Sequence, residues 1–171
     1  ERLDTHKLVE EYMLLANREV AKFIFDAIKG KGKRDTGSIY RIHDVPDQER
    51  MADLAVFVKA LGYDLKTKDG KVTARDIKSL LVQIQGTQHE ALISTALIRS
   101  MQKAVYSTKN IGHFGLAFEY YTHFTSPIRR YPDLLIQRIL QRHLMHENFG
   151  DKEIVAFQDI AEKSTAREID A

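Results

Sequence analysis

Apolar side chains recur at helical spacing through the first thirty residues of the chain. From His6 to about Ile28 this spacing predicts one long amphipathic helix, with Asp4 or Thr5 as its N-terminal cap. Its apolar positions are Leu8, Tyr12, Leu15, Val20, Phe23, Ile24 and Ala27. The glycine-containing basic segment 30–37 should end this helix and form a loop.

Shorter elements follow. The pattern predicts short strands over 38–43, 104–108 and 113–117, and helices over 47–61, 73–85, 89–101 and from 150 to the end. Thr73 should cap the second of these helices, and Asp69-Gly70 should form the turn before it. The inward faces of the first and third are expected at Met51, Leu54, Ala55, Val58, Leu61, Leu92, Ala96, Leu97 and Met101. The fold class predicted is α+β, predominantly helical with a few short strands.

Composition narrows the possible functions. The 171 residues carry 26 Lys and Arg against 24 Asp and Glu, a formal net charge of +2, so any contact with nucleic acid must be local. The length suggests one domain. No apolar run is long enough to cross a membrane, and the absence of cysteine excludes disulfides and cysteine-ligated zinc. We therefore expect a cytoplasmic protein without a membrane partner.

Residues 121–133 carry the most specific chemical signal. Ser126 followed by Pro127 is typical of a helix start, which would place Arg129 and Arg130 in the first helical turn. Cations are unfavourable at the positive end of a helix dipole. An anion, most naturally a phosphate, would bind both the guanidinium groups and the unpaired N–H groups of such a helix start.

Two features of the same segment leave a second interpretation open. Pro132 removes a helical hydrogen bond and should kink the helix or restart it near itself. Asp133 stands four residues after Arg129 and three after Arg130, so either arginine could form an ordinary ion pair on a solvated helix face. Spacing alone does not separate this ion pair from a phosphate site.

Other candidates are weaker from the residues alone. Solvation of both carboxylates is the simpler interpretation of Glu10 and Glu11, and Asn17 is open between burial and exposure. His113 could meet a ligand, although a lone histidine in a strand is more often structural. Aromatic residues near the arginines either stack on bases or fill the core: Phe114, Phe118, Tyr120, Tyr121, Phe124 and Tyr131. The sequence contains no aspartate cluster with magnesium-binding spacing and no convincing zinc-ligand spacing.

Several stretches taken together resemble one known family. They are residues 6–17 (HKLVEEYMLLAN), 39–44 (IYRIHD), 97–101 (LIRSM), 104–107 (AVYS), 110–117 (NIGHFGLA) and 121–134 (YTHFTSPIRRYPDL). In this order they resemble the RNase II/RNase R family, whose catalytic domain is called RNB, and the likeness is greatest to its bacterial RNase R branch. The resemblance runs from about residue 5 to 149 and more loosely to the end.

The resemblance implies a hydrolytic enzyme that degrades single-stranded RNA processively from 3′ to 5′ with Mg²⁺ and releases nucleoside 5′-monophosphates. It implies that Arg129, in the S-P-I-R-R-Y motif, assists at the scissile phosphate. It also implies that Glu11, with Glu10 as the alternative, helps to hold the 3′-terminal nucleotide. The matching motif positions with an RNA-channel or scaffolding role are Arg130, Tyr131, His113, Thr122 and Ser126.

The chain departs from the family pattern mainly by what it lacks. The family's metal-binding aspartates lie upstream of the E-E-x-M helix, and its cold-shock and S1 domains have no counterpart here. The resemblance therefore implies that residues 1–171 are the C-terminal portion of an RNB catalytic domain, inactive alone, with the Mg²⁺ ligands outside this chain. The expected partners are single-stranded RNA and the N-terminal part of that domain, which would cover an apolar face of the first helix. The alternative is a fragment of a non-catalytic, RNA-binding member of the family.

Overall fold

The computed structural model describes residues 3–29, 37–66 and 72–170. Contacts within the chain divide it into two compact units, where the length alone suggested one domain. The first unit joins Glu1–His43 to Ala104–Ala171, and the second is the intervening segment Asp44–Lys103. None of the helices in the described ranges is long and apolar enough to cross a membrane.

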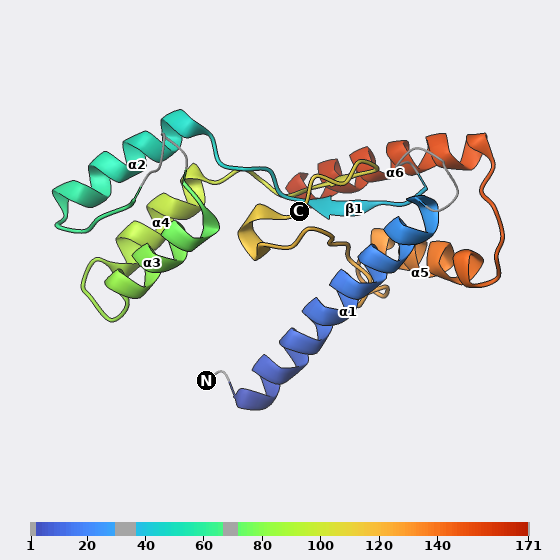
Figure 1. Ribbon diagram of the computed structural model, residues 1–171, viewed down its shortest axis with the longest axis horizontal. Helices are drawn as coiled ribbons and strands as arrows, with labels where there is room; N and C mark the ends of the chain where they lie inside the picture. The colour runs from blue at the N-terminus through green and yellow to red at the C-terminus, as the bar shows by residue number, and fades with distance from the viewer. Residues whose placement is uncertain (1–2, 30–36, 67–71, 171) are drawn as a thin grey trace. The chain divides into compact units, whose positions relative to one another are not determined.

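The first unit combines helices with a small antiparallel sheet. Its described elements are α1 (Asp4–Lys29), β1 (Tyr40–Ile42), β2 (Val105–Ser107), a 3₁₀ turn (Phe114–Leu116), α5 (Tyr131–Leu144) and α6 (Asp151–Asp170) (Figure 1). In the sheet, Tyr40 lies opposite Ser107 and Ile42 opposite Val105. The strands predicted within 38–43 and 104–108 are therefore confirmed, and so is the mostly helical α+β class.

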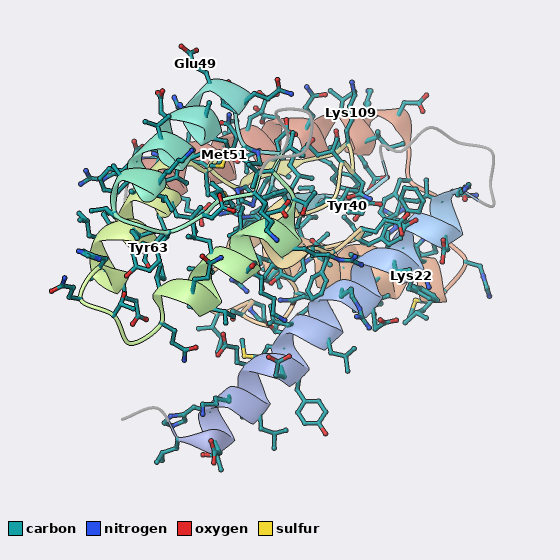
Figure 2. The ribbon with its side chains drawn as sticks, turned by 60° about the vertical axis from the view of Figure 1, so that its left-hand side comes forward. Lys22, Tyr40, Glu49, Met51, Tyr63 and Lys109 are labelled. Atoms are coloured by element: carbon teal, nitrogen blue, oxygen red, sulfur yellow. The ribbon has the colours of Figure 1, made fainter. Side chains whose placement is uncertain are left out.

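The core of this unit forms where α1, α5 and α6 meet the sheet. Its buried apolar residues are Ile24, Ile28, Ile39, Tyr106, Ile136, Ile139, Phe157 and Ala161. Tyr40 is also fully buried and lies among the side chains of the interior, whereas Lys22 and Lys109 project outward (Figure 2). Burial of these apolar side chains is the main force that holds α6 against α5 and the sheet.

Helix α1 is buried only along its C-terminal half. Its buried face consists of Asn17, Ala21, Ile24 and Ile28, which follow one another at spacings of three and four residues. The predicted helix is confirmed, but several of its apolar positions are exposed: Leu8, Tyr12, Leu15 and Phe23. Phe23 lies about 100° around the helix from its buried neighbour, and the other three line a shallow hollow to which Phe118 also contributes.

The second unit is made of three helices within the described residues: α2 (Gln48–Ala60), α3 (Ala74–Ile84) and α4 (Glu90–Ser100). The Asp47 side chain caps α2 by accepting from the backbone N–H groups of Glu49 and Arg50. Thr73 and Asp76 cap α3 reciprocally, as the sequence predicted for Thr73. The buried residues of these helices are Met51, Leu54, Val58, Ile77, Leu80, Ile84, Ile93 and Leu97.

Two predictions for the second unit need comment. Leu92 was expected to face inward, but it is exposed, and Ile93 is buried in its place because it shares a helix face with Leu97. The turn predicted at Asp69-Gly70 lies outside the described residues, as does most of the loop predicted over 30–37.

The strand predicted over 113–117 is wrong. His113 forms single bridges to His43 and Phe118, and the chain then turns through the 3₁₀ segment. The His113 Nδ1 atom accepts from the backbone N–H of Leu116, and Ala117 adopts a left-handed backbone with φ of 54°. This local hydrogen bonding competes with extension of the sheet, which alternating apolar residues alone do not reveal.

Candidate nucleic-acid interface

The arginine segment is held by one buried carboxylate, that of Asp133. This side chain has no exposed surface and lies in the first turn of α5. Its Oδ1 accepts from the Ser126 backbone N–H and from Arg130 Nη2, and its Oδ2 accepts from Arg130 Nε, each at 2.8 Å. The bidentate ion pair neutralises a charge that would otherwise be buried alone. Asp133 thereby fixes both ends of segment 126–130.

The helix start predicted at Ser126 is wrong. The N–H groups of Arg129 and Arg130 do bond to the Ser126 carbonyl, but the turn ends at Arg130, whose backbone is extended. Helix α5 begins at Tyr131 with a proline in its first turn, because that proline has no N–H to continue the preceding turn. The two arginines thus precede the helix, and the alternative pairing of Arg130 with Asp133 is the one observed.

Arg129 differs from its neighbour in both exposure and partners. It is exposed beside Ile128, whose side chain is fully exposed, and it forms no ion pair with any residue in the described ranges. The Arg130 guanidinium is partly buried and committed to Asp133. Of the two predicted arginines, Arg129 is the one whose charge is available to a ligand.

The two glutamates of α1 line different hollows. Glu10 lines a cavity of about 320 Å³ that also contains Arg130 and Thr125, and the remaining residues of its wall are His6, Val9, Met13, Leu14, Asn17 and Tyr121. Glu11 lines a separate hollow with Arg18 and Phe118. Consecutive residues on a helix point about 100° apart, so the two carboxylates do not share one site.

Asn17 joins α1 to the segment that leads to the arginines. Only 3% of its surface is exposed. Its Oδ1 accepts from the Phe124 backbone N–H at 2.9 Å, and its Nδ2 donates to the Tyr121 hydroxyl at 3.2 Å. The sequence left Asn17 open between burial and exposure, and a lone amide within an apolar helical face was the available signal.

Of the remaining predicted residues, Tyr131 lies at the surface beside Arg129, whereas Thr122 and Ser126 support the local structure. Tyr131 is 54% exposed beside Arg129. Thr122 is buried, and its hydroxyl donates to the Ile39 carbonyl at 2.7 Å. This bond joins the start of β1 to the segment that leads to the arginines. Ser126 meets Asp133 through its backbone. The structure therefore brings Arg129, Arg130 and Tyr131 together and sets Thr122 in the interior.

His113 lies in an aromatic cluster rather than beside the arginines. Its ring packs against those of His43 and Tyr121, with centroids 5.0 and 5.3 Å away. Burial and the neighbouring His43 lower the pKa of His113 to about 4. Burial and the cation of Arg130 lower the pKa of His123 to about 3, and His123 Nδ1 lies 2.8 Å from the Tyr106 hydroxyl. Both imidazoles are therefore neutral at physiological pH.

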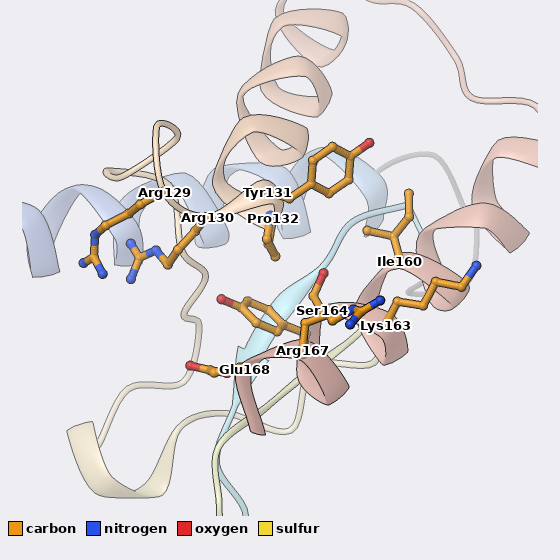
Figure 3. Close-up of a pocket in the computed structure, with 10 residues that line it drawn as sticks. Arg129, Arg130, Tyr131, Pro132, Ile160, Lys163, Ser164, Arg167 and Glu168 are labelled. Atoms are coloured by element: carbon orange, nitrogen blue, oxygen red, sulfur yellow. The ribbon is translucent and has the colours of Figure 1, made fainter. Parts of the chain in front are cut away.

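A larger cleft lies between the arginine segment and α6 (Figure 3). It encloses about 590 Å³ and is lined by Tyr106, Arg129, Arg130, Tyr131, Pro132, Ile160, Lys163, Ser164, Arg167 and Glu168. The sequence did not single out the residues of α6. Lys163 and Arg167 stand at i,i+4 in a helix in which acidic residues outnumber basic ones, and this spacing was the available local sign of them.

The chain also contains no evident metal centre in the part that the structure describes. Over residues 3–29, 37–66 and 72–170, no group of three or more His, Cys, Asp or Glu side chains gathers closely enough to bind an ion.

Comparison with known proteins gives concordant matches. The model of the RNB domain family matches residues 1–146. Ribonuclease R of Aquifex aeolicus is 35% identical over 161 residues, which are 94% of this chain and 22% of that protein. Ribonuclease R of Vibrio parahaemolyticus is 44% identical over 140 residues, 82% of this chain and 16% of that protein. The chain thus spans about a fifth of the length of these relatives.

Solved structures give the same result. Mycoplasma genitalium RNase R in complex with double-stranded RNA superimposes with a TM-score of 0.83 at 29% identity, over 99% of this chain and 30% of that one. The complex of the same protein with ribose-methylated single-stranded RNA gives a TM-score of 0.80 at 30% identity, over 94% and 25% of the two chains. The fold described above is therefore that of one part of these larger structures.

Proposed function

Because this chain belongs to the RNB family, we propose that it forms part of a hydrolytic exoribonuclease, which degrades single-stranded RNA from its 3′ end and releases nucleoside 5′-monophosphates. Similarity to ribonuclease R over 94% of the chain supports the proposal, as do the RNA complexes of the Mycoplasma genitalium protein. Since the chain spans 22% of the Aquifex relative, the activity is proposed for a parent protein and residues 1–171 for the C-terminal portion of its catalytic domain.

One observation carries the proposal, namely that the guanidinium group of Arg129 is exposed and unengaged by any ion pair within the described residues. The backbone of Arg129 is held by the turn at Ser126. Hydrolysis of a phosphodiester builds negative charge on the phosphate oxygens in the transition state. A cation that is already positioned stabilises that charge without further reorganisation. Arg129 suits this role better than Arg130, whose charge is already paired with Asp133.

A carboxylate of α1 is proposed to hold the hydroxyl groups of the 3′-terminal ribose. The motif favoured Glu11, with Glu10 as the alternative. The cavity that Glu10 shares with Arg130 and Thr125 supports Glu10, because a nucleotide there would meet the arginine segment as well. Glu11 faces the hollow beside Phe118. Arg130, Tyr131, His113, Thr122 and Ser126 are proposed to line or support the RNA channel.

Mg²⁺ is proposed as the cofactor of the parent enzyme, where it would supply charge neutralisation at the scissile phosphate. The described residues of this chain do not fit a metal site. The proposal places the Mg²⁺ ligands outside the chain because the metal-binding aspartates of the family lie upstream of the E-E-x-M helix, which here is residues 10–13. The proposed contribution of residues 1–171 is to bind and orient the RNA and, through Arg129, to stabilise the charge that develops on the scissile phosphate.

The test is the variant Arg129→Ala in the parent protein. Loss of a cation at the scissile phosphate should lower kcat/KM roughly 5- to 150-fold, which corresponds to a loss of about 1–3 kcal/mol of transition-state stabilisation. The matched control is Arg138→Ala, which removes an exposed arginine from α5 that lines none of these hollows. Shortening of a 5′-labelled oligoribonucleotide from its 3′ end gives the rates.

Two results would count against the proposal. Equal turnover in the parent protein and in Arg129→Ala would remove the role of the arginine. A parent protein that binds RNA but releases no mononucleotide with Mg²⁺ would favour the non-catalytic, RNA-binding alternative.

A further inference from the structure

Helix α6 presents one face to the cleft that also contains Arg129. The residues concerned are Ile160, Lys163, Ser164, Arg167 and Glu168, which recur at the three- and four-residue spacing of a single helix face. These residues lie beyond the segment 1–146 that matches the RNB domain model. The far wall of the cleft is thus built by a part of the chain to which no role has been given.

The electrostatic balance of the cleft is positive. Four of its ten lining residues are cations and one, Glu168, is an acid. Glu168 is already engaged by Arg41, which donates from Nη2 to Glu168 Oε1 at 3.0 Å and from Nη1 to Oε2. Its charge is therefore largely cancelled by a residue outside the lining. A ligand in the cleft meets a surplus of positive charge.

Two of the cations lack competing partners. Arg129 and Arg167 are exposed, and neither forms an ion pair with any residue in the described part of the chain. Lys163 contacts Asp159 at 2.7 Å, but both side chains are largely exposed, and such surface pairs contribute little. An anionic ligand can therefore recruit Arg129, Arg167 and Lys163 at small cost.

The floor between these charges is apolar and aromatic. Tyr106 is 6% exposed, and one face of its ring is covered by the Arg41 guanidinium, 4.6 Å from the ring centroid. Pro132 and Ile160 continue the floor. Figure 3 shows Arg129 and Arg130 at one end of the cleft and Lys163 at the other, with Pro132 and Ser164 between them.

We propose that α6 forms a second phosphate-binding wall of the RNA path, in which Lys163 and Arg167 hold backbone phosphates on the side opposite Arg129. Cations at both ends of an apolar floor match a nucleic-acid strand, in which anionic phosphates alternate with apolar sugar and base faces. A single phosphate would engage only one end of the cleft. The inference rests on the proposed function and adds to it the residues of α6.

The test compares Lys163→Gln and Arg167→Gln with two matched controls. Lys152→Gln removes a lysine from the start of the same helix, and Arg138→Gln an exposed arginine from α5, both outside the cleft. Binding of the protein to a fluorescent single-stranded oligoribonucleotide is measured across a series of salt concentrations. Thermal unfolding of each variant shows that its fold is retained, which is expected because all four side chains are exposed.

Each cleft variant should weaken binding at low salt by roughly three- to tenfold. It should also reduce the slope of log Kd against log salt by about 0.7, the value for one phosphate contact to a single strand. The controls should change neither quantity. Nucleoside 5′-monophosphate and inorganic phosphate are added as competitors, and an RNA strand should displace the probe at far lower concentration than either.

The outcomes separate this inference from the proposed function. Wild-type affinity and slope in both cleft variants would overturn the role of α6, while the Arg129→Ala result would still decide the catalytic proposal. Competition by inorganic phosphate as strong as by RNA would also overturn it, because it would indicate an isolated anion site. If the parent protein has no nuclease activity but the cleft variants weaken binding and reduce the salt slope as expected, the role of α6 in RNA binding is supported and the catalytic proposal is rejected.

Discussion

Asp133 shows how one residue can set the chemistry of two others. By pairing with Arg130 and accepting from the Ser126 backbone, it withdraws one arginine from the ligand and leaves Arg129 available. Two adjacent arginines that look equivalent in the sequence thus differ in how available their positive charge is to a ligand, because that of Arg130 is already paired with Asp133.

We predict that Asp133→Ala is strongly destabilising. It leaves the partly buried Arg130 guanidinium unpaired and removes the acceptor of the Ser126 N–H, so the free energy of unfolding should fall by about 3–5 kcal/mol. Asp159→Ala is the matched control, because it breaks the exposed pair with Lys163 and should cost at most about 1 kcal/mol. Urea unfolding measures both, and equal losses would contradict the buried ion pair.

The neutral histidines predict a pH dependence of stability. The pKa values of His113 and His123 fall from 6.5 to about 4 and about 3 on folding. Below pH 6.5 the unfolded chain therefore binds protons that the folded chain does not. Stability should be highest above that pH and should decrease steadily as the pH falls toward 4.

Urea unfolding at a series of pH values checks this dependence. The double variant His113→Gln, His123→Gln should flatten the decrease, whereas His6→Gln, which changes an exposed residue of α1, should leave it intact. If the free energy of unfolding changes with pH equally in the unmodified chain and in the double variant, groups other than these two histidines cause the effect.

At the scale of elements, the starts of α2 and α3 are fixed by their own capping residues, Asp47 and Thr73. The Thr73 side chain accepts from the Asp76 backbone N–H, and the Asp76 carboxylate accepts from the Thr73 backbone. The Thr73 hydroxyl also donates to the Asp76 carboxylate, and this bond, together with the one from the Thr73 backbone N–H, lowers the pKa of Asp76 because both stabilise its charged form. Because the two capping residues lie only three positions apart, the start of α3 could be predicted correctly from the sequence.

Thr73→Ala should therefore destabilise the protein by about 1 kcal/mol through loss of the N-cap. The control is Thr95→Ala within α4, where the hydroxyl bonds only to the Ala91 carbonyl of its own helix and alanine is the better helix former. Thermal unfolding compares the two variants, and a neutral Thr73→Ala would show that the capping box contributes nothing measurable.

Two other segments depart from the element that their apolar or capping pattern indicated, because side chains within a few residues change the local backbone. Helix α5 starts at Tyr131 and not at Ser126, because Asp133 and Pro132 together favour an extended residue between the two turns. The segment at 113–117 bends through a 3₁₀ turn because His113 satisfies the Leu116 N–H locally. The restart of the helix near Pro132 is one of the two outcomes predicted from its missing N–H. At 113–117, by contrast, the alternating pattern indicated a strand, and a side-chain hydrogen bond decided against it.

At the scale of the whole molecule, the chain is expected to act only as part of a larger protein. It spans 22% of the Aquifex aeolicus ribonuclease R that it resembles. If the Mg²⁺ ligands of the catalytic domain lie outside it, as proposed, the 171-residue chain should release no mononucleotides from single-stranded RNA with Mg²⁺ present. Analysis of the products from a uniformly labelled oligoribonucleotide measures this, with the parent protein as the positive control. Mg²⁺-dependent release by the chain alone would refute the proposed division.

The sequence by itself determined most of the helices, the positions of the two short strands and the family, because each is recognised from motifs and spacings within short stretches of the chain. Periodicity places α2 and α3, and the S-P-I-R-R-Y motif identifies the segment with Arg129.

Only the tertiary structure decided which side chains meet. Asn17 reaches Tyr121 across 104 positions of sequence, Glu10 rather than Glu11 shares a cavity with Arg130, and α6 brings Arg167 to the cleft that contains Arg129. Local spacing carries no record of such contacts, because they arise when buried faces of distant helices pack together and bring their polar neighbours with them.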